Sequence, residues 1–394
     1  MANFQVQREA LLQVVESNAD KLFKIACDIY DHPEIGREEF YACERLTKFL
    51  EGEGFVVERG VGGLGTAFRA TWEQGSDGPA IGFMMEYDAL RNMGHGCGHH
   101  LQGPTTIGAA LALKAVVKEP FKLVLYGTPD EENKGGKIDM VDQGLFRDVD
   151  VMFSHHTGQK TGCSFSNKAL APQRVTFHGT AAHASGAPWN GRSAMDAMIL
   201  AFHGLEVMRE HVRDGSRIHY SILEGTGPSN IVPDTARAHI TLRSTDKVYL
   251  EDMRRRMENV LRGACLMTDT TYEVEWRPVY WNYIPNQTLR QRTFAIAKEL
   301  GITTLSTDDT PGNGSSDIGN VSWVAPSMNL YTHYPFSGHT MENVENGKTD
   351  KARSAMVEGS KIFSLIALEC ITDPDYLASV KTEYQIAVAH AYKS

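Results

Sequence analysis

Short apolar runs alternate with a helical pattern in the first part of the chain, and this order limits the fold more than any other feature. Residues 80–85, 122–126 and 149–154 are apolar runs of the length of a buried strand. The Ala/Leu-rich stretch 105–117 between the first two runs has the pattern of a helix. Strands separated by helices favour an α/β fold, a mostly parallel sheet with helices on both faces. Sites in such sheets lie at the carboxyl ends of the strands.

The pattern changes near residue 171, and the 394 residues are enough for two domains. Two helices and about four strands are expected there, with helices at 192–212 and 250–262 and strands at 173–178, 218–223, 235–243 and 272–277. We interpret 171–284 as an inserted α+β lid and dimerisation domain. Residues 1–170 and 285–394 then form the two parts of the catalytic domain.

Charge and cysteine content restrict the partners and the compartment. The net charge of −10 argues against a nucleic-acid or anionic-membrane partner. The six cysteines have no short paired spacing, so a reducing compartment fits better than a disulfide framework. The N-terminal residues do not read as a signal peptide, and no run approaches the ~18 apolar residues of a membrane span. We therefore expect a cytoplasmic protein with no membrane partner.

A cluster of histidine and cysteine follows the first strand. Residues 94–100 read GHGCGHH and come soon after the acidic turn 86–88. Cys97 and His99, two residues apart, can chelate one metal ion or bridge two. Packing in a core explains a single histidine, but not this cluster in a glycine-rich turn. The pattern indicates a metal site.

The second strand ends in three consecutive carboxylates, Asp130, Glu131 and Glu132. An exposed acidic turn would explain them equally well if they stood alone. A hydrolytic metal site needs one carboxylate as a ligand and another as a general base, and Glu131 and Glu132 can provide both.

The third strand, 149–154, ends in His155 and His156. Because the carboxyl ends of parallel strands meet along one edge, the three sets of residues should be neighbours in space. We predict His156 as a ligand and His155 as a supporting or structural residue.

Three weaker candidates lie elsewhere in the sequence. His339 is either a ligand or a loop histidine without a role, and the polar segment 314–320 reads equally well as a helix cap. His183, in a turn between a strand and a helix, either caps and packs or donates a hydrogen bond to a substrate carbonyl.

In their order along nearly the whole chain, these motifs resemble the aminoacylase/carboxypeptidase family of co-catalytic metallopeptidases. The branch that includes aminobenzoyl-glutamate hydrolases and auxin-conjugate hydrolases is the most similar. The resemblance rests on six segments: 86–90 (EYDAL), 94–99 (GHGCGH), 128–132 (TPDEE), 181–184 (AAHA), 230–234 (NIVPD) and 314–322 (GSSDIGNVS).

The resemblance implies a site for two divalent metal ions. Cys97 would bridge the ions, and the other ligands would be His99, Glu132, His156 and His339. It further implies that Glu131 is the general base and that Asp88 orients a ligand. His183 would be a catalytic lid histidine that reaches the site of a partner subunit, which implies a homodimer formed through the lid domain.

Two positions depart from the family pattern. His100 stands where Asn or Asp is usual, and Glu86 stands where a shorter Asp is common. Either residue could shift the metal geometry or add a ligand. Thiolate, imidazole and carboxylate ligands suit zinc, while manganese and cobalt stay open.

The expected function is hydrolysis of the C–N amide bond of a small N-acyl or N-aroyl amino acid or related conjugate, by a metal-activated water with Glu131 as general base. Arg192, Asn230 and Arg243 are candidates for binding a substrate carboxylate. The aromatic residues Trp189, Tyr280, Trp281 and Tyr283 line a pocket or, in the reading we favour, the core at the domain junction.

Three alternatives stay open on the sequence alone. The same metal site could deaminate an aromatic amine. Cys97 could be the nucleophile of a cysteine hydrolase. The chain could also be a non-catalytic, metal-dependent binding protein.

Overall fold

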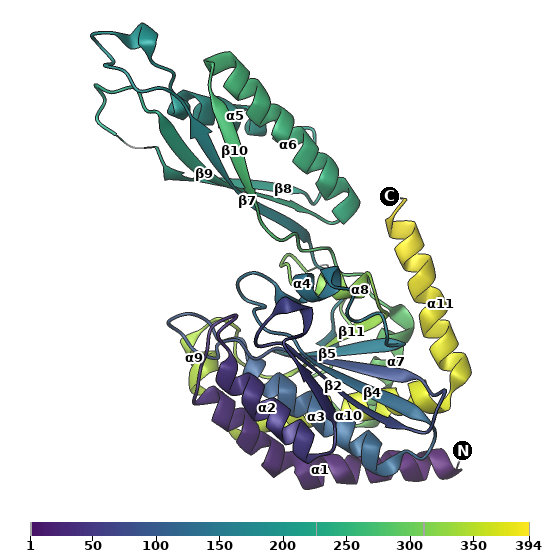
Figure 1. Cartoon of the computed structure of the whole chain (residues 1–394). Helices are drawn as coiled ribbons and strands as arrows, with labels where there is room; N and C mark the ends of the chain where they lie inside the picture. The colour runs from purple at the N-terminus through teal and green to yellow at the C-terminus, as the bar shows by residue number, and fades with distance from the viewer. Residues whose placement is uncertain (1, 226, 310–311, 394) are drawn as a thin grey trace. The chain divides into compact units, whose positions relative to one another are not determined.

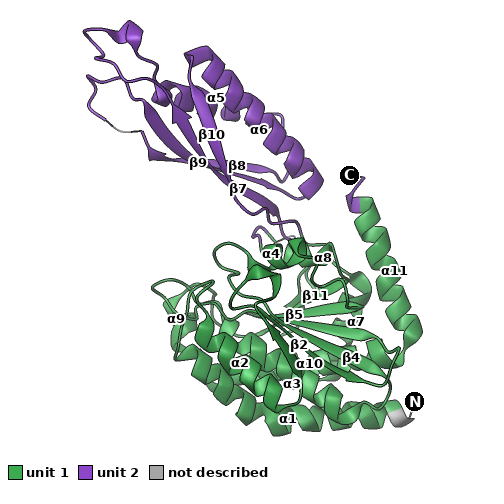
Figure 2. Cartoon of the chain, in the orientation of Figure 1, with its two compact units in different colours: residues 1–166, 283–312, 316–390 green, residues 167–282, 313–315, 391–394 purple. Residues whose placement is uncertain are grey.

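The computed structural model describes residues 2–225, 227–309 and 312–393, which form two compact units (Figures 1 and 2). Unit 1 comprises residues 1–166, 283–312 and 316–390, and unit 2 comprises 167–282, 313–315 and 391–394. The main segment of unit 2 begins four residues before the expected start at 171, and its two short additions were not expected. The expected domain ends at residues 1 and 394 lie outside the described residues.

Unit 1 is built around a seven-stranded sheet. Its strands are β1 (Val56–Arg59), β2 (Phe68–Gln74), β3 (Ala80–Met85), β4 (Phe121–Gly127), β5 (Val151–Gly158), β6 (Gly162–Cys163) and β11 (Ser327–His333), in the order β1-β2-β4-β3-β5-β11-β6. The central strands β4, β3, β5 and β11 are parallel, whereas β1, β2 and β6 pair antiparallel at the edges. The α/β fold with a mostly parallel central sheet is therefore confirmed.

Helices of unit 1 bury the central strands. They are α1 (Ala2–Tyr30), α2 (Phe40–Gly52), α3 (Gln102–Val116), α4 (Gly136–Asp142), α7 (Gln287–Glu299), α8 (Ile318–Ser322), α9 (Met341–Glu345), α10 (Asp350–Thr372) and α11 (Pro374–Ala391). Helices α1, α3 and α10 pack on one another, and α3 and α10 also pack on the sheet (Figure 1). Phe83, Phe153 and Phe363 join the two layers, with ring centroids 5.6–5.8 Å apart. Strand β3 is buried along its whole length, which explains its continuous apolar run.

The strand ends bring the predicted residues to one edge of the sheet. Met85 at the end of β3 pairs with Gly127 at the end of β4, and Tyr331 of β11 pairs with His156 of β5. Strand β5 continues to Gly158, so the expected end at residue 154 is wrong and both histidines lie within the strand. Because side chains alternate along a strand, His155 and His156 point to opposite faces.

In its described residues, unit 2 has a four-stranded antiparallel sheet and two α-helices. Its elements are β7 (Ala169–His178), α5 (Ala194–Arg209), β8 (Arg217–Glu224), β9 (Thr235–Ser244), α6 (Lys247–Thr268) and β10 (Thr271–Trp276), and the strand order is β10-β7-β9-β8. Every second side chain of β7 is buried, which matches a sheet with one face covered. The core includes Phe177 from the sheet, Leu205 from α5 and Met253 from α6.

Among the helices of the described residues, none has an apolar stretch sufficient to span a bilayer.

Candidate metal centre

The glycine-rich turn of residues 94–98 places Cys97 and His99 against strand β5. Gly98 has a φ of 78°, which favours glycine, and a Cβ there would lie 2.6 Å from Thr157 Oγ1. Only glycine fits both the positive φ and the lack of space beside Thr157. His99 follows at once, as the first residue of the short 3₁₀ helix His99–Leu101.

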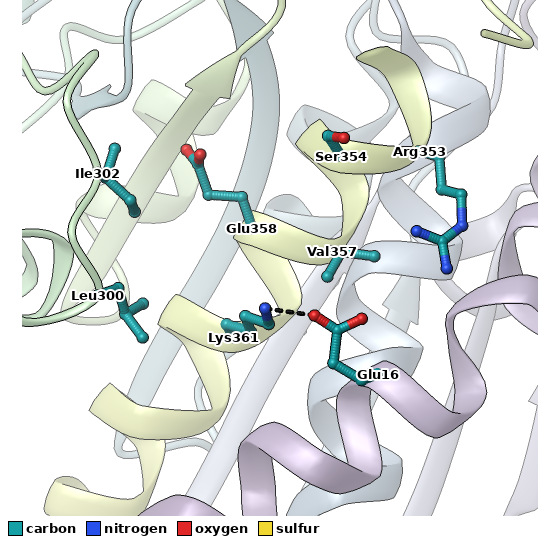
Figure 3. A pocket seen from close by; sticks show the side chains of 8 residues that line it. All are labelled: Glu16, Leu300, Ile302, Arg353, Ser354, Val357, Glu358 and Lys361. Atoms are coloured by element: carbon teal, nitrogen blue, oxygen red, sulfur yellow. Dashed lines mark ion pairs between the residues drawn. The ribbon is translucent and has the colours of Figure 1, made fainter. Parts of the chain in front are cut away.

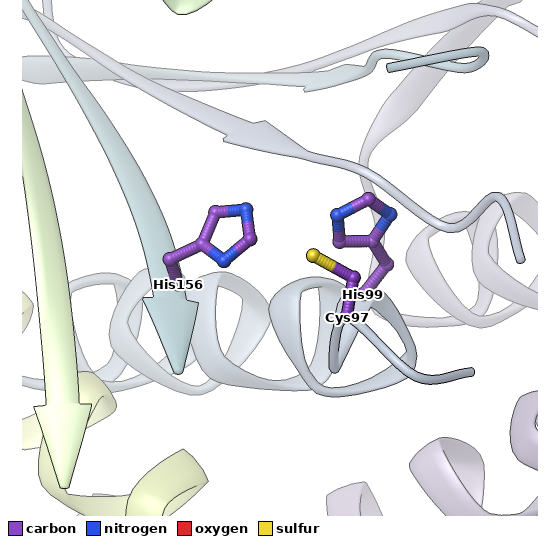
Figure 4. A group of neighbouring side chains, drawn as sticks. All are labelled: Cys97, His99 and His156. Carbon is purple, nitrogen blue, oxygen red and sulfur yellow. The ribbon is translucent and has the colours of Figure 1, made fainter. Parts of the chain in front are cut away.

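Among the described residues, potential metal ligands meet in three groups, within each of which the ligand atoms all lie within 4.8 Å of one another. The groups are Cys97, His99 and His156; Cys97, Glu132 and His339; and Glu86, His99 and Glu131. Figure 4 shows the side chains of the first group directed toward one another, with His156 on strand β5. The structure thus brings together the five predicted ligands, and Cys97 belongs to two of the groups.

Asp88 fixes the orientation of two of these residues. His99 Nδ1 lies 3.0 Å from the Asp88 carbonyl oxygen and 3.2 Å from Asp88 Oδ1, so the ring donates its Nδ1–H there. The other carboxylate oxygen, Asp88 Oδ2, accepts a hydrogen bond of 3.0 Å from the backbone N–H of Glu132. Asp88 therefore fixes the ring of His99 with Nε2 toward the ligand groups, a relation common around metal sites.

His339 reaches the centre from the loop before α9. Its backbone N–H donates to the Gly96 carbonyl oxygen at 2.8 Å, and its Nε2 lies 3.2 Å from Glu132 Oε1. Of the two readings left open for this histidine, the geometry favours the ligand.

Glu131 lies among charged side chains. Burial raises the pKa of Glu131 well above its usual value, and the negative charges of Glu86 and Asp317 raise it further, while Lys137 and His99 act in the opposite direction. A raised pKa suits a carboxylate that must accept and then return a proton. Asp130, the first of the three consecutive acids, is instead turned to Arg37, with 2.6 Å between Oδ2 and Nε.

A buried ion-pair network next to the ligands was not expected from the sequence. Lys137 Nζ lies 2.5 Å from Glu86 Oε1 and 2.7 Å from Asp317 Oδ1, and all three side chains are almost completely buried. Asp317 lies in the segment that reads equally well as a helix cap, and its Oδ2 does accept a backbone N–H. That N–H belongs to Lys137 of α4 rather than to the helix that Asp317 precedes.

Cys97 is poorly suited to act as a nucleophile in this environment. Burial raises the pKa of the Cys97 thiol to about 12. Since the thiolate is the reactive form, the cysteine-hydrolase alternative requires a strong compensating charge.

His100 faces away from the ligand groups. Its Nε2–H donates to the Gly347 carbonyl oxygen at 2.8 Å, and its ring meets that of Tyr30 edge-on at 5.2 Å. His155 is likewise turned away, with Nε2 2.7 Å from Thr332 Oγ1. Both contacts fit structural roles.

The remaining predicted residues lie in unit 2, at two opposite ends of its sheet. The backbones of His183 and Ile231 pair, and Arg192 pairs with Thr180, so His183, Asn230 and Arg192 gather beyond the end of β7 at His178. Arg243 pairs with Leu170 at the other end of β7, roughly 30 Å away for a strand of this length. Within unit 2 of one chain, Arg243 and His183 therefore cannot contact the same small molecule.

The four aromatic candidates have different environments. Tyr280 and Tyr283 are buried, and the Tyr283 hydroxyl donates to the Ser327 carbonyl oxygen at 2.9 Å. Trp281 has Lys247 Nζ 3.4 Å from its ring centroid, and Trp189 is 72% exposed. The burial of the two tyrosines fits the interpretation that they are core residues.

A surface pocket of about 280 Å³ lies elsewhere in unit 1 (Figure 3). It is lined by parts of α1, α10 and the segment after α7. Its Lys361 pairs with Glu16 at 2.5 Å, as the dashed line shows. These charges compensate each other, and none of the predicted site residues lines this pocket.

Comparisons with known proteins show what the whole chain is similar to. The chain is 32% identical to the mouse (Mus musculus) Xaa-Arg dipeptidase, over 98% of this chain and 93% of that protein. It is 29% identical to one of the subunits of the p-aminobenzoyl-glutamate hydrolase of Escherichia coli, over 94% of this chain and 93% of that protein. A crystal structure from Bacillus subtilis, described as a dinuclear metal binding peptidase, has the same fold, with a TM-score of 0.67 and 18% identity over 90% of this chain and 99% of that one.

A family model supplies the assignment. The model of peptidase family M20/M25/M40 matches residues 81–369, which include all five predicted ligands and the whole of unit 2 up to residue 315. Its members are hydrolases that act on C–N bonds. Together with the long alignment to the mouse protein, the match shows that the chain belongs to peptidase family M20/M25/M40.

Proposed function

We propose that this chain is a two-metal amidohydrolase that releases an amino acid from small N-acyl or N-aroyl conjugates. The observation that carries the proposal is the position of Cys97, whose sulfur belongs to two separate ligand groups and also senses the charge of Glu131. A thiolate shared between two groups of ligands fits a bridge between two ions. Cys97, His99 and His156 would hold one cation, and Cys97, Glu132 and His339 the other.

Two buried atoms support the fit. His99 Nε2 and Glu132 Oε1 have no hydrogen-bond partner within the described residues. A buried polar atom without a partner is costly, and a bound cation would satisfy both atoms. The combination of thiolate, imidazole and carboxylate suits zinc, with manganese and cobalt as further candidates.

The two cations, when bound, would polarise the amide carbonyl and make a water molecule acidic. Glu131 takes a proton from the attacking water as the new C–O bond forms. It then delivers this proton to the leaving nitrogen as the C–N bond breaks, so one carboxylate serves both halves of the reaction. Its raised pKa, caused first by burial, makes it a stronger base than an ordinary glutamate.

His183 would donate a hydrogen bond to the developing oxyanion. Its Nδ1 accepts the backbone N–H groups of Ser185 and Gly186, at 3.2 and 3.0 Å. A neutral imidazole whose Nδ1 accepts carries its proton on Nε2, so His183 presents an N–H donor.

The substrate class follows from the relatives and from unit 2. One relative is named for Xaa-Arg dipeptides and the other for p-aminobenzoyl-glutamate, and both names describe amides of an amino acid. Arg192 and Asn230 lie at the same end of unit 2 as His183 and would bind the carboxylate of the substrate. Arg192 is paired with Asp269 at 2.8 Å and would exchange this partner on binding.

Chelation tests the proposal. Treatment with EDTA should abolish hydrolysis of a panel of N-acyl amino acids, dipeptides ending in arginine, and aminobenzoyl-glutamate. Zinc, manganese or cobalt should restore it, at two ions per chain by metal analysis. A cysteine hydrolase would survive EDTA, and release of ammonia instead of an amino acid would indicate deamination of an arylamine.

We further propose that the chain forms a homodimer through unit 2. Strand β8 is an edge strand, and Ile222 and Tyr220 on it are 55% and 37% exposed. An apolar edge strand is a site for pairing with a second chain. Helix α5, which contacts β8, adds Ile199, which is 49% exposed.

Substituting Ile222→Lys should therefore convert a dimer into a monomer, because a lysine on an edge strand opposes pairing. Light scattering after size exclusion measures the mass. The matched control is Leu266→Lys on α6, which changes an equally apolar residue that is 77% exposed and distant in sequence from the edge strand. A dimer that persists in the first variant, or dissociates equally in both, would contradict this interface.

A further inference from the structure

Glu86, which stands where the family pattern has a shorter residue, is held rigidly at the edge of the metal centre. Glu86 is the residue directly after strand β3, and its side chain is almost completely buried. Its Oε1 accepts from Lys137 Nζ at 2.5 Å, and its Oε2 accepts from Gln102 Nε2 at 2.7 Å. Gln102 also accepts the backbone N–H of Glu86 at 2.9 Å, so the residue is fixed at three points.

The oxygen Oε2 of Glu86 faces two of the predicted ligand atoms. It lies 3.2 Å from His99 Nε2 and 3.4 Å from His156 Nε2. His99 directs its Nδ1 to Asp88, and its buried Nε2, which faces Glu86, has no hydrogen-bond partner within the described residues. A cation between the two atoms would satisfy the buried nitrogen and attract the carboxylate oxygen.

The spacing of these three atoms fits a shared ion. Ligand atoms about 2.0–2.1 Å from a tetrahedral cation lie about 3.3–3.4 Å from one another. The two measured distances, 3.2 and 3.4 Å, fall close to this spacing.

From this geometry we propose that Glu86 is an additional protein ligand, through Oε2, of the cation that His99 would hold, since Glu86 and His99 also share a ligand group. Lys137 and Asp317 are the positioning residues: the Lys137 ammonium holds Oε1 and leaves Oε2 for the ion, and Asp317 holds the lysine. This inference rests on the proposed two-metal function. The inference adds a carboxylate oxygen to an ion for which the proposed function names only one sulfur and two nitrogens as ligand atoms.

The test is metal binding to the variant Glu86→Gln, measured by titration of the metal-free protein with Zn²⁺ alone in competition with a chelator. Gln keeps the shape of the side chain but removes the charge. We expect one of the two ions to bind at least tenfold more weakly, and the second to bind as in the wild type. The control is Glu369→Gln, a nearly buried carboxylate paired with Arg8 and Arg292 far from the centre in sequence, which should bind both ions normally.

Unchanged binding of both ions to Glu86→Gln would overturn the inference but not the proposed function. A wild-type protein that binds no Zn²⁺ would instead overturn both. His99→Gln serves as the positive control for loss of a ligand.

If Glu86→Gln does not fold, a crystal structure of the wild-type protein with Zn²⁺ shows whether Glu86 Oε2 binds the ion. Glu86 Oε2 within about 2.3 Å of an ion supports the assignment. A distance above 3 Å, with His99 donating a hydrogen bond to Glu86 instead, refutes it.

Discussion

Replacing Glu131 with glutamine is expected to lower kcat by about 10²–10⁴-fold while both metal ions remain bound. Glutamine has nearly the same shape but cannot accept the proton of the attacking water or return it to the leaving nitrogen. The wild-type rate should fall as the pH drops below the raised pKa of Glu131, because the protonated carboxyl is no longer a base. The residual rate of the variant should lack this dependence. Steady-state kinetics across pH, with metal analysis of the same samples, measures both effects.

The neighbouring variant Glu132→Gln provides the contrast. Glu132 lies 3.2 Å from His339 Nε2 and belongs to a ligand group, so its variant should lose affinity for an ion as well as activity. If Glu131→Gln kept a near wild-type kcat, or lost its metal as Glu132→Gln is expected to do, Glu131 would not be the general base.

The gathering of the candidate ligands could be predicted from the sequence because it depends on one rule. Strands β3, β4 and β5 are parallel, so the segments that follow or end them share an edge of the sheet. Cys97, Glu132 and His156 meet for this reason. His339 comes from a distant loop, and only the family resemblance raised it above an ordinary loop histidine.

The sequence does not predict which strands and which charged side chains pair when they are distant along the chain. The edge strands β1 and β2 and the strand order have no local signature, because they are set by which apolar surfaces meet. Lys137 follows two glycines after the acidic turn, and nothing in this segment indicates burial, yet the fold buries the lysine between Glu86 and Asp317. The separation of Arg243 from His183 likewise follows from the register of β7 and β9, which polar side chains do not reveal.

The largest expected effect on stability comes from Lys137→Met in the metal-free protein, a loss of about 3–5 kcal/mol in the free energy of unfolding near pH 8. Lys137 is completely buried and compensates the charges of Glu86 and Asp317. Methionine fills a similar volume, so the loss reports the two carboxylates left in the interior without a cation. Urea unfolding in the presence of EDTA measures it.

The loss should depend on pH, with a sign fixed by these carboxylates. Burial raises the pKa of Asp317 to about 6 even though Lys137 acts to lower it. Burial also disfavours the charged form of Glu86, but Lys137, followed by His99 and His156, holds the pKa of Glu86 well below its usual value. Without the lysine the pKa of Asp317, which already lies above that of the unfolded chain, rises further, and the pKa of Glu86 rises from its lowered value. Folding then favours the protonated carboxyls, and stability falls as pH increases through this range. The difference between variant and wild type should therefore shrink from pH 8 to pH 5.

Lys381→Met is the matched control, because Lys381 pairs with Asp150 at 2.6 Å but remains 47% exposed. An exposed ion pair contributes about 0–1 kcal/mol, and its loss should vary little between pH 5 and pH 8. Equal losses in the two variants would show that the Lys137 network is no stronger than a surface pair. A loss for Lys137→Met that stayed constant with pH would show that missing packing, rather than uncompensated carboxylates, destabilises the protein.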